Sequence, residues 1–196
     1  MDLDFERITS ELSNQQLTAL ANLRIRIFHD FPYLYEGDMA YEQEYLHTFL
    51  KAENSFLLLV KDGEKVVGAS TAMPLNQETP NISDPWKEAG YDIDSIFYFG
   101  ESVLDKAYRG QGIGVKFFEE REAFAKSLGQ FNRCSFCGVV RPAQHPLMPD
   151  NYLPLDSFWK KRGYQRMEGL TCEIAWKDLD EPEESSKSLQ FWSKEV

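Results

Sequence analysis

Apolar and polar positions along this chain follow two periods. Apolar residues recur at the spacing of amphipathic helices within 14–31, 39–53, 113–128 and 155–162. Shorter apolar or alternating runs predict strands within 3–8, 55–60, 64–72, 96–104, 131–140 and 164–176. This mixture of periods predicts an α/β (α+β) domain in which a central sheet is flanked by helices.

Pro and Gly residues mark where these elements end or bend. Pro32 ends the first helix, and Gly129 is a C-terminal cap for the third. Lys61-Asp62-Gly63 predicts a hairpin, and Gly100 predicts a β-bulge or a close backbone approach within 96–104. The connection 73–95 is rich in Pro, Asn, Asp and Gly, and we expect a connection of this length to cover a site as a lid.

The most informative stretch is Tyr108-Arg109-Gly110-Gln111-Gly112-Ile113-Gly114, which joins the strand at 96–104 to the helix at 113–128. Its three alternate glycines leave the backbone open to a ligand, and the helix that starts here presents the positive end of its dipole. Backbone N–H groups in such a turn converge on an anion. The stretch therefore predicts a phosphate cradle, with a glycine-rich loop that only starts a helix as the alternative.

Spacing narrows the choice of ligand. The stretch fits neither the dinucleotide fingerprint nor the P-loop. It fits Arg/Gln-x-x-Gly-x-Gly at Arg109, Gly112 and Gly114, which resembles the pyrophosphate-binding motif of the GNAT superfamily of N-acetyltransferases. The resemblance implies acetyl-coenzyme A as the co-substrate. It also implies a set of cofactor-binding residues: Val103 and Leu104 through their backbone, and Arg109, Gly110, Gln111, Gly112, Ile113 and Gly114.

The resemblance spans about residues 3–176 and implies a mixed, mostly antiparallel central sheet of about six to seven strands flanked by helices. We therefore predict a single acetyltransferase-like domain at 1–176. Residues 177–196 are acidic, contain serines and include an apolar run near their end, which predicts an acidic C-terminal extension. Whether the extension packs across the domain or onto a partner stays open in the sequence.

Glu101 is the candidate general base. Period-two alternation places it on one face with Phe97 and Phe99, where a carboxylate is unexpected. The resemblance implies that a glutamate on this strand takes the proton of the acceptor amine, and aromatic surroundings predict a raised pKa for it. The alternative is a structural carboxylate that pairs with an arginine such as Arg24 or Arg141.

The segment 141–156 is an insertion relative to the resembling fold, with four prolines beside the expected position of the thioester. Its polar groups are His145, Asp150, Asn151 and Tyr152, of which His145 and Tyr152 are candidate catalytic residues. A surface histidine is the simpler interpretation of His145. By the same resemblance the helices at 14–31 and 39–53 wall the acceptor site, with four aromatic residues as candidate contacts: Phe31, Tyr33, Tyr35 and Tyr45.

The general acid is less clear from the sequence. In the superfamily a tyrosine four residues before a glycine often protonates the departing thiolate, and here Trp159 stands at that distance from Gly163. An indole N–H is no practical acid at neutral pH. Tyr152, Tyr98, Cys137 or solvent are the alternatives.

Charge and cysteine content limit the partners. The net charge of −11 argues against binding to nucleic acid or to anionic membranes, and it would attract a cationic acceptor. Between residues 106 and 126, by contrast, five basic residues face three glutamates, which suits an anionic coenzyme. The three cysteines lack the spacing of a zinc site, so we expect no metal. The N-terminus lacks a signal peptide, which favours a cytoplasmic protein, and a homodimer is compatible with the sequence.

We therefore predict an enzyme, an N-acetyltransferase that moves the acetyl group of acetyl-coenzyme A to a primary amine of a small molecule or peptide by direct attack. One alternative is a non-catalytic module that binds acyl-coenzyme A and regulates a partner, which the substitution at Trp159 favours. Another is an enzyme of the same fold with a longer acyl donor.

Overall fold

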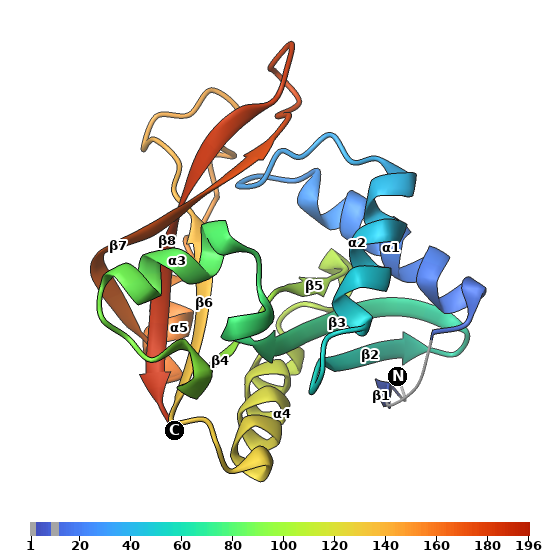
Figure 1. The fold of residues 1–196 in the computed structure, drawn as a ribbon. Helices are drawn as coiled ribbons and strands as arrows, with labels where there is room; N and C mark the ends of the chain where they lie inside the picture. The colour runs from blue at the N-terminus through green and yellow to red at the C-terminus, as the bar shows by residue number, and fades with distance from the viewer. Residues whose placement is uncertain (1–2, 9–11) are drawn as a thin grey trace.

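The structure is a computed structural model that describes residues 3–8 and 12–196. Its strands are β1 (Leu3–Ile8), β2 (Phe56–Asp62), β3 (Lys65–Pro74), β4 (Ile96–Tyr98), β5 (Ser102–Leu104), β6 (Arg133–Val139), β7 (Gln165–Trp176) and β8 (Ser185–Glu195). Its helices are α1 (Asn14–Phe28), α2 (Met39–Leu50), α3 (Pro80–Glu88), α4 (Ile113–Leu128) and α5 (Asp156–Lys161). Figure 1 shows how the helices surround the sheet.

The described strands form one sheet in the order β1-β2-β3-β4-β6-β8-β7, with β5 paired to β3. The pair β4–β6 is parallel and the other described pairs are antiparallel, so the predicted mixed, mostly antiparallel sheet is confirmed. The count is eight strands rather than six to seven. The difference arises because the predicted strand 96–104 is split in two and because the segment after Trp176 supplies a further strand.

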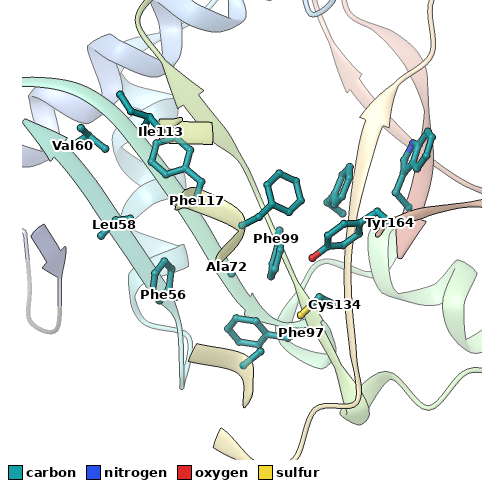
Figure 2. Close-up of a cluster of buried hydrophobic side chains, with 14 of the residues drawn as sticks. Phe56, Leu58, Val60, Ala72, Phe97, Phe99, Ile113, Phe117, Cys134 and Tyr164 are labelled. Carbon is teal, nitrogen blue, oxygen red and sulfur yellow. The ribbon is translucent and has the colours of Figure 1, made fainter. Parts of the chain in front are cut away.

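Helices cover both faces of the sheet, as the alternation in β2 requires. Phe56 and Leu58 belong to the cluster that packs against Phe117 of α4, whereas Leu57 and Leu59 pack against α1 and α2. Figure 2 shows the first cluster with Phe97, Phe99 and Phe117 together. On the other half of the sheet, Trp86 of α3 packs on Phe191 of β8 with ring centroids 5.3 Å apart. These contacts fix the central strands from both sides.

Most predicted elements form, with shifted ends. The first helix ends at Phe28 rather than residue 31 and the second at Leu50 rather than residue 53. Gly129 caps α4 with a φ of 73°, as predicted. Much of the connection 73–95 is regular structure: β3 runs to Pro74, and α3 packs through buried Ile82 and Trp86. Its role as a lid stays a prediction.

A β-bulge interrupts the central strand at residues 99–101. Ser70 pairs with Ser102 and Met73 pairs with Tyr98, so two residues of β3 face three residues of the other strand. The N–H groups of Gly100 and Glu101 both reach Thr71, at its carbonyl (3.2 Å) and its hydroxyl (3.0 Å). A Cβ on Gly100 would lie 2.7 Å from the Thr71 hydroxyl oxygen, so the predicted bulge and close approach are confirmed.

The residues predicted to form an acidic extension, 177–196, lie within the domain. β8 pairs with β6 on one side and with β7 on the other, so it is an interior strand. Leu189, Phe191 and Trp192 are buried, each at most 3% exposed. Residue 176 is therefore no structural boundary. Within residues 3–8 and 12–196, none of the helices is long and apolar enough to cross a membrane.

Candidate functional site

The strands β5 and β6 diverge beyond the bulge. β4 pairs with β6 as far as Tyr98 and Ser135, and the N–H of Phe99 donates to the Ser135 carbonyl (2.7 Å). Beyond this point β6 continues along β8, whereas β5 pairs with β3. Figure 1 shows the two strands separating at the centre of the molecule. The side of β5 that faces away from β3, here called the open edge, carries no strand in the described structure.

Hydrogen bonds at its two ends fix which backbone groups of β5 face the open edge. The Glu101 carbonyl accepts from a β3 N–H (3.0 Å), and the Asp105 N–H donates to a β3 carbonyl (2.8 Å). In an antiparallel ladder such pairs alternate, so Val103 also bonds to β3 while Ser102 and Leu104 turn their N–H and C=O groups outward. Of the two residues predicted to bind through their backbone, Leu104 therefore faces the open edge and Val103 does not.

The glycine-rich stretch forms an open turn at the start of α4. Gly110 and Gly112 have φ values of 77° and 83°, which glycine adopts without strain. A Cβ added to either residue would meet nothing within 4 Å, so the turn is bare on its outer side. The N–H groups of Ile113 and Gly114 precede the first helical hydrogen bonds of α4, which Val115 and Lys116 donate to the Gly112 carbonyl. Gln111 is exposed in this turn.

Arg109 links this turn to the open edge. Its side chain is exposed, and its Nε donates to the outward carbonyl of Leu104 (3.3 Å). The cradle and the open edge are thus adjacent, and a ligand anchored at Gly110–Gly112 can extend along β5 toward the bulge.

Glu101 lies at the far end of this path, in an ionic environment. Its carboxylate forms a buried ion pair with Arg24 of α1, which also pairs with Glu42 of α2. The guanidinium of Arg24 stacks on the ring of Tyr45 (4.4 Å), whose hydroxyl donates to Glu101 Oε2 (3.4 Å). Burial alone would lower the pKa of Arg24, but the charges of Glu101 and Glu42 outweigh it and raise the pKa.

The prediction that Glu101 shares a face with Phe97 and Phe99 is wrong. Both phenylalanines pack on the α4 side, whereas the Glu101 side chain meets α1 and α2. The extra residue in the bulge reverses the alternation, because one inserted residue moves every later side chain to the other face. Of the two arginines proposed as its partner, Arg24 is the one that pairs with Glu101.

A second carboxylate, Glu78, is within electrostatic range of Glu101 and was not singled out by the sequence. It follows β3 by a short turn, is half-buried, and accepts the Thr79 N–H at its Oε2 (3.2 Å). Burial raises the pKa of Glu78 to about 7, and the charge of Glu101 adds to the effect while the Thr79 N–H opposes it. A carboxyl group that titrates near neutral pH is suited to proton transfer.

Neighbouring contacts hold Glu78 in place. The side-chain amide of Gln77 both accepts from the backbone N–H of Glu53 (2.8 Å) and donates to its carbonyl (2.8 Å). Asn76 donates to Asp94 (2.8 Å). The turn that carries Glu78 is therefore fixed to the end of α2 and to the segment before β4.

Arg141 ties the loop after α1 to the other half of the sheet. Its guanidinium donates to the carbonyls of Pro32 and Tyr33, each at 2.6 Å, and forms a two-point ion pair with Asp178 at 2.5 and 2.9 Å. Asp178 follows β7 and is 1% exposed. This loop carries the candidate acceptor contacts, so a buried clamp sets their position.

The inserted segment brings His145 and Tyr152 together around one ring. Tyr152 packs edge-on against Phe31 with centroids 4.6 Å apart, and His145 lies 5.6 Å from the same ring. The Leu147 N–H donates to His145 Nδ1 (3.2 Å). Burial raises the pKa of Tyr152, and the charge of Asp156 adds to this. His145 and Tyr152 thus form an aromatic group on the acceptor side with Phe31.

The remaining alternatives for the general acid are also placed. The Tyr98 hydroxyl and Cys137 Sγ are hydrogen-bonded to each other at 3.0 Å. Trp159 packs over Gly138 of β6, where an added Cβ would lie 2.9 Å from the indole ring. Cys134 lies on the opposite face of β6 from Cys137, in the α4 cluster, and all three cysteines are free thiols. Within the described residues no group of three or more His, Cys, Asp or Glu side chains is arranged to hold a metal.

A sequence model of the Acetyltransferase (GNAT) family matches residues 18–149, which include the bulge, the open edge and the cradle. The chain belongs to the GNAT acetyltransferase family. The matched range contains the bulged central strand, its divergence from the next strand and the glycine-rich turn.

Solved structures of acetyltransferases share this fold. A GNAT-family acetyltransferase from Streptococcus pneumoniae aligns over 100% of both chains with 14% identity and a TM-score of 0.60. Ribosomal-protein-alanine N-acetyltransferase from Brucella melitensis aligns over 95% of this chain and 98% of its own, with 12% identity and a TM-score of 0.62. An acetyltransferase from Streptococcus agalactiae aligns over 98% of both chains, with 17% identity and a TM-score of 0.62. A search of curated proteins by sequence gives no match.

Proposed function

We propose that this GNAT protein transfers the acetyl group of acetyl-coenzyme A to a primary amine by direct attack. The observation that carries the proposal is the continuity of three features: a bare N–H cradle at Gly110–Gly112, a strand edge at Leu104 that no described strand covers, and a pair of carboxylates beyond the bulge. The family match supports acetyl transfer as the reaction.

The cradle fits a pyrophosphate. Two glycines at positive φ with open space outside them allow a phosphate to approach the N–H groups at the start of α4, where the helix dipole favours an anion. Arg109 is exposed beside these groups and adds a positive charge. The outward N–H and C=O of Leu104 match the amide groups of a pantetheine arm, and the outward N–H of Ser102 lies one step closer to Glu101.

The carboxylates divide the work at the acceptor end. Glu101 is held in place by its ion pair with Arg24, and its carboxylate attracts a cationic acceptor to the site. Glu78 accepts the proton when the amine attacks, since its pKa of about 7 lets it be both ionised and a useful base near neutral pH. Glu78 thus takes the role that the sequence assigned to Glu101, and Glu101 becomes its electrostatic partner.

The attack forms the C–N bond as the C–S bond breaks, and the thiolate that leaves takes a proton. The Ser102 N–H donates to the carbonyl oxygen as it gains negative charge. Tyr152 serves as the proton donor to the thiolate. Its contact with Phe31 places the inserted segment beside the loop that carries the candidate acceptor contacts. His145, on the same ring, shapes the pocket for the acceptor.

The acceptor chemistry follows from charge. Two carboxylates in one region, with a net charge of −11 on the whole chain, favour a cationic amine over a neutral or acidic one. A small polyamine-like molecule and a basic peptide both meet this description.

The experiment is a turnover screen. Acetyl-coenzyme A is mixed with the enzyme and a panel of cationic, neutral and anionic primary amines, and the released thiol and the acetylated product are both quantified. We expect product with cationic amines. For an amine that carries a second positive charge, removal of that charge should lower kcat/KM at least tenfold, which corresponds to about 1.4 kcal/mol. Acyl-coenzyme A binding without acetylation of any amine would instead support a regulatory module, and faster turnover with longer acyl donors would correct the donor.

A further inference from the structure

Arg121 of α4 is a buried guanidinium that the proposed chemistry does not use. It is 2% exposed, and its side chain stacks on Phe99 (4.1 Å) and Phe118 (5.1 Å). None of the ion pairs among residues 3–8 and 12–196 joins it to a carboxylate. A buried charge without a counter-ion is costly, so an apolar residue on this helix face would be the simpler choice for packing alone.

The two terminal nitrogens of Arg121 donate hydrogen bonds to the bulge. Nη1 donates to the carbonyls of Thr71 (3.3 Å) and Glu101 (3.1 Å), and Nη2 donates to the Ser102 hydroxyl (2.9 Å). Nε donates to the Phe117 carbonyl one turn back (3.0 Å), which fixes the side chain to its own helix. The planar fork thus binds both strands at the point where they are out of register. A lysine cannot make these contacts together.

The Glu101 carbonyl is the informative partner. A trans peptide group points its C=O and its N–H in opposite directions. The Glu101 carbonyl faces β3 and Arg121, so the N–H on the same peptide group, that of Ser102, points to the open edge. The positively charged guanidinium that donates to this carbonyl also polarises the peptide group, which makes the Ser102 N–H a better donor.

We infer that Arg121 is a positioning residue that holds the Glu101–Ser102 peptide group so that its N–H is aimed at the reacting carbonyl. The inference rests on the proposed function for its catalytic consequence, but its structural part, that the guanidinium holds the bulge in place, is separate. Burial lowers the pKa of Arg121 to about 10, so the group stays protonated at neutral pH and the charge is present when the enzyme works.

The test compares Arg121→Lys with Phe118→Leu, which disturbs the same packing without removing a hydrogen bond to the bulge. Hydrogen exchange of three amides is followed by NMR: Thr71 and Gly100, which bond within the bulge, and Asp105, which bonds to β3 beyond it. We expect the exchange of Thr71 and Gly100 to rise at least tenfold in Arg121→Lys while that of Asp105 is unchanged. In Phe118→Leu we expect the three rates to move together.

The same variants are assayed for turnover and for acetyl-coenzyme A binding. Loss of a donor to a developing oxyanion typically costs about 10²–10³ in kcat. Arg121→Lys should therefore lose kcat by about this factor, with less than threefold change in the acetyl-coenzyme A Kd. Equal effects of Arg121→Lys and Phe118→Leu on exchange and on kcat would overturn the inference. If the wild type acetylates no amine, the proposed function fails, and the exchange rates alone still decide whether Arg121 holds the bulge.

Discussion

Replacing Glu78 by Gln tests which carboxylate takes the proton. Glu78 is half-buried, and its burial raises its pKa to about 7, with a smaller contribution from the charge of Glu101. With this pKa, about a tenth of the enzyme carries an ionised Glu78 at pH 6 and about nine tenths at pH 8. We therefore expect kcat/KM of the wild type to rise through this range and to level off above about pH 8.

In Glu78→Gln this rise should disappear, and kcat should fall by about 10²–10⁴, the usual contribution of a positioned base. Glu101→Gln is the matched control, since it also removes one carboxylate from the same region. Without the charge of Glu101 the pKa of Glu78 falls, so the rise should persist but shift to lower pH. The KM for a cationic amine should increase in this variant because its anion is lost.

The assay measures initial rates of thiol release at saturating acetyl-coenzyme A from about pH 5.5 to about pH 9. The acceptor carries a permanent positive charge away from an attacking amine that stays unprotonated throughout, so that the observed titration belongs to the enzyme. Glu78 is not the base if Glu78→Gln keeps the pH dependence of the wild type, or if Glu101→Gln is the variant in which this dependence vanishes. The second outcome would restore Glu101 as the base.

Three further predictions concern stability and packing. Arg24→Met leaves Glu42 and Glu101 buried without their shared cation and should lower the free energy of unfolding by about 3–5 kcal/mol in urea titrations. A loss below about 1 kcal/mol would mean that the ion pairs are not formed. Gly138→Ala forces a Cβ against Trp159 and should lower the free energy of unfolding by about 1–3 kcal/mol. The double variant that also carries Trp159→Phe should regain this stability, and no regain would place the strain elsewhere. The folded-state pKa of Glu78 lies above its unfolded value, so the free energy of unfolding should fall as the pH rises from about 4.5 to about 7. Glu78→Gln should flatten this pH dependence in thermal unfolding.

The sequence predicted those parts of the site that depend on local backbone chemistry. The cradle was predictable because Gly110 and Gly112 are needed wherever φ is positive and the backbone must be bare. Gly100 signalled the bulge for a similar reason, since no side chain fits against Thr71. Arg24 was one of two arginines proposed to pair with Glu101, and the sequence alone did not decide between it and Arg141.

What the sequence missed depends on tertiary contacts. Alternation assigned Glu101 to the wrong face because the bulge adds one residue, and the size of a bulge cannot be read from the pattern. Glu78 sits in a segment of turn-like composition, and its pKa depends on burial and on Glu101. Arg121 was also missed, although its helical spacing from Phe117 and Phe124 places a charge on the apolar stripe of α4. β8 was taken for an extension because acidic residues and serines precede the apolar run at 189–192. That run is buried because β8 lies between β6 and β7.

The most direct test of the central claim is calorimetric titration of acetyl-coenzyme A into the wild type, Gly112→Asp and Gly129→Asp. The two glycines lie at opposite ends of α4 with φ values of 83° and 73°, and an added Cβ meets nothing at either, so the backbone strain is matched. A carboxylate about 5 Å from a phosphate costs about 3 kcal/mol at an effective dielectric constant of about 20, or roughly 100-fold in Kd. We predict about micromolar binding to the wild type and to Gly129→Asp and a loss of about this size in Gly112→Asp. No binding to the wild type, or equal binding to both variants, would contradict the account.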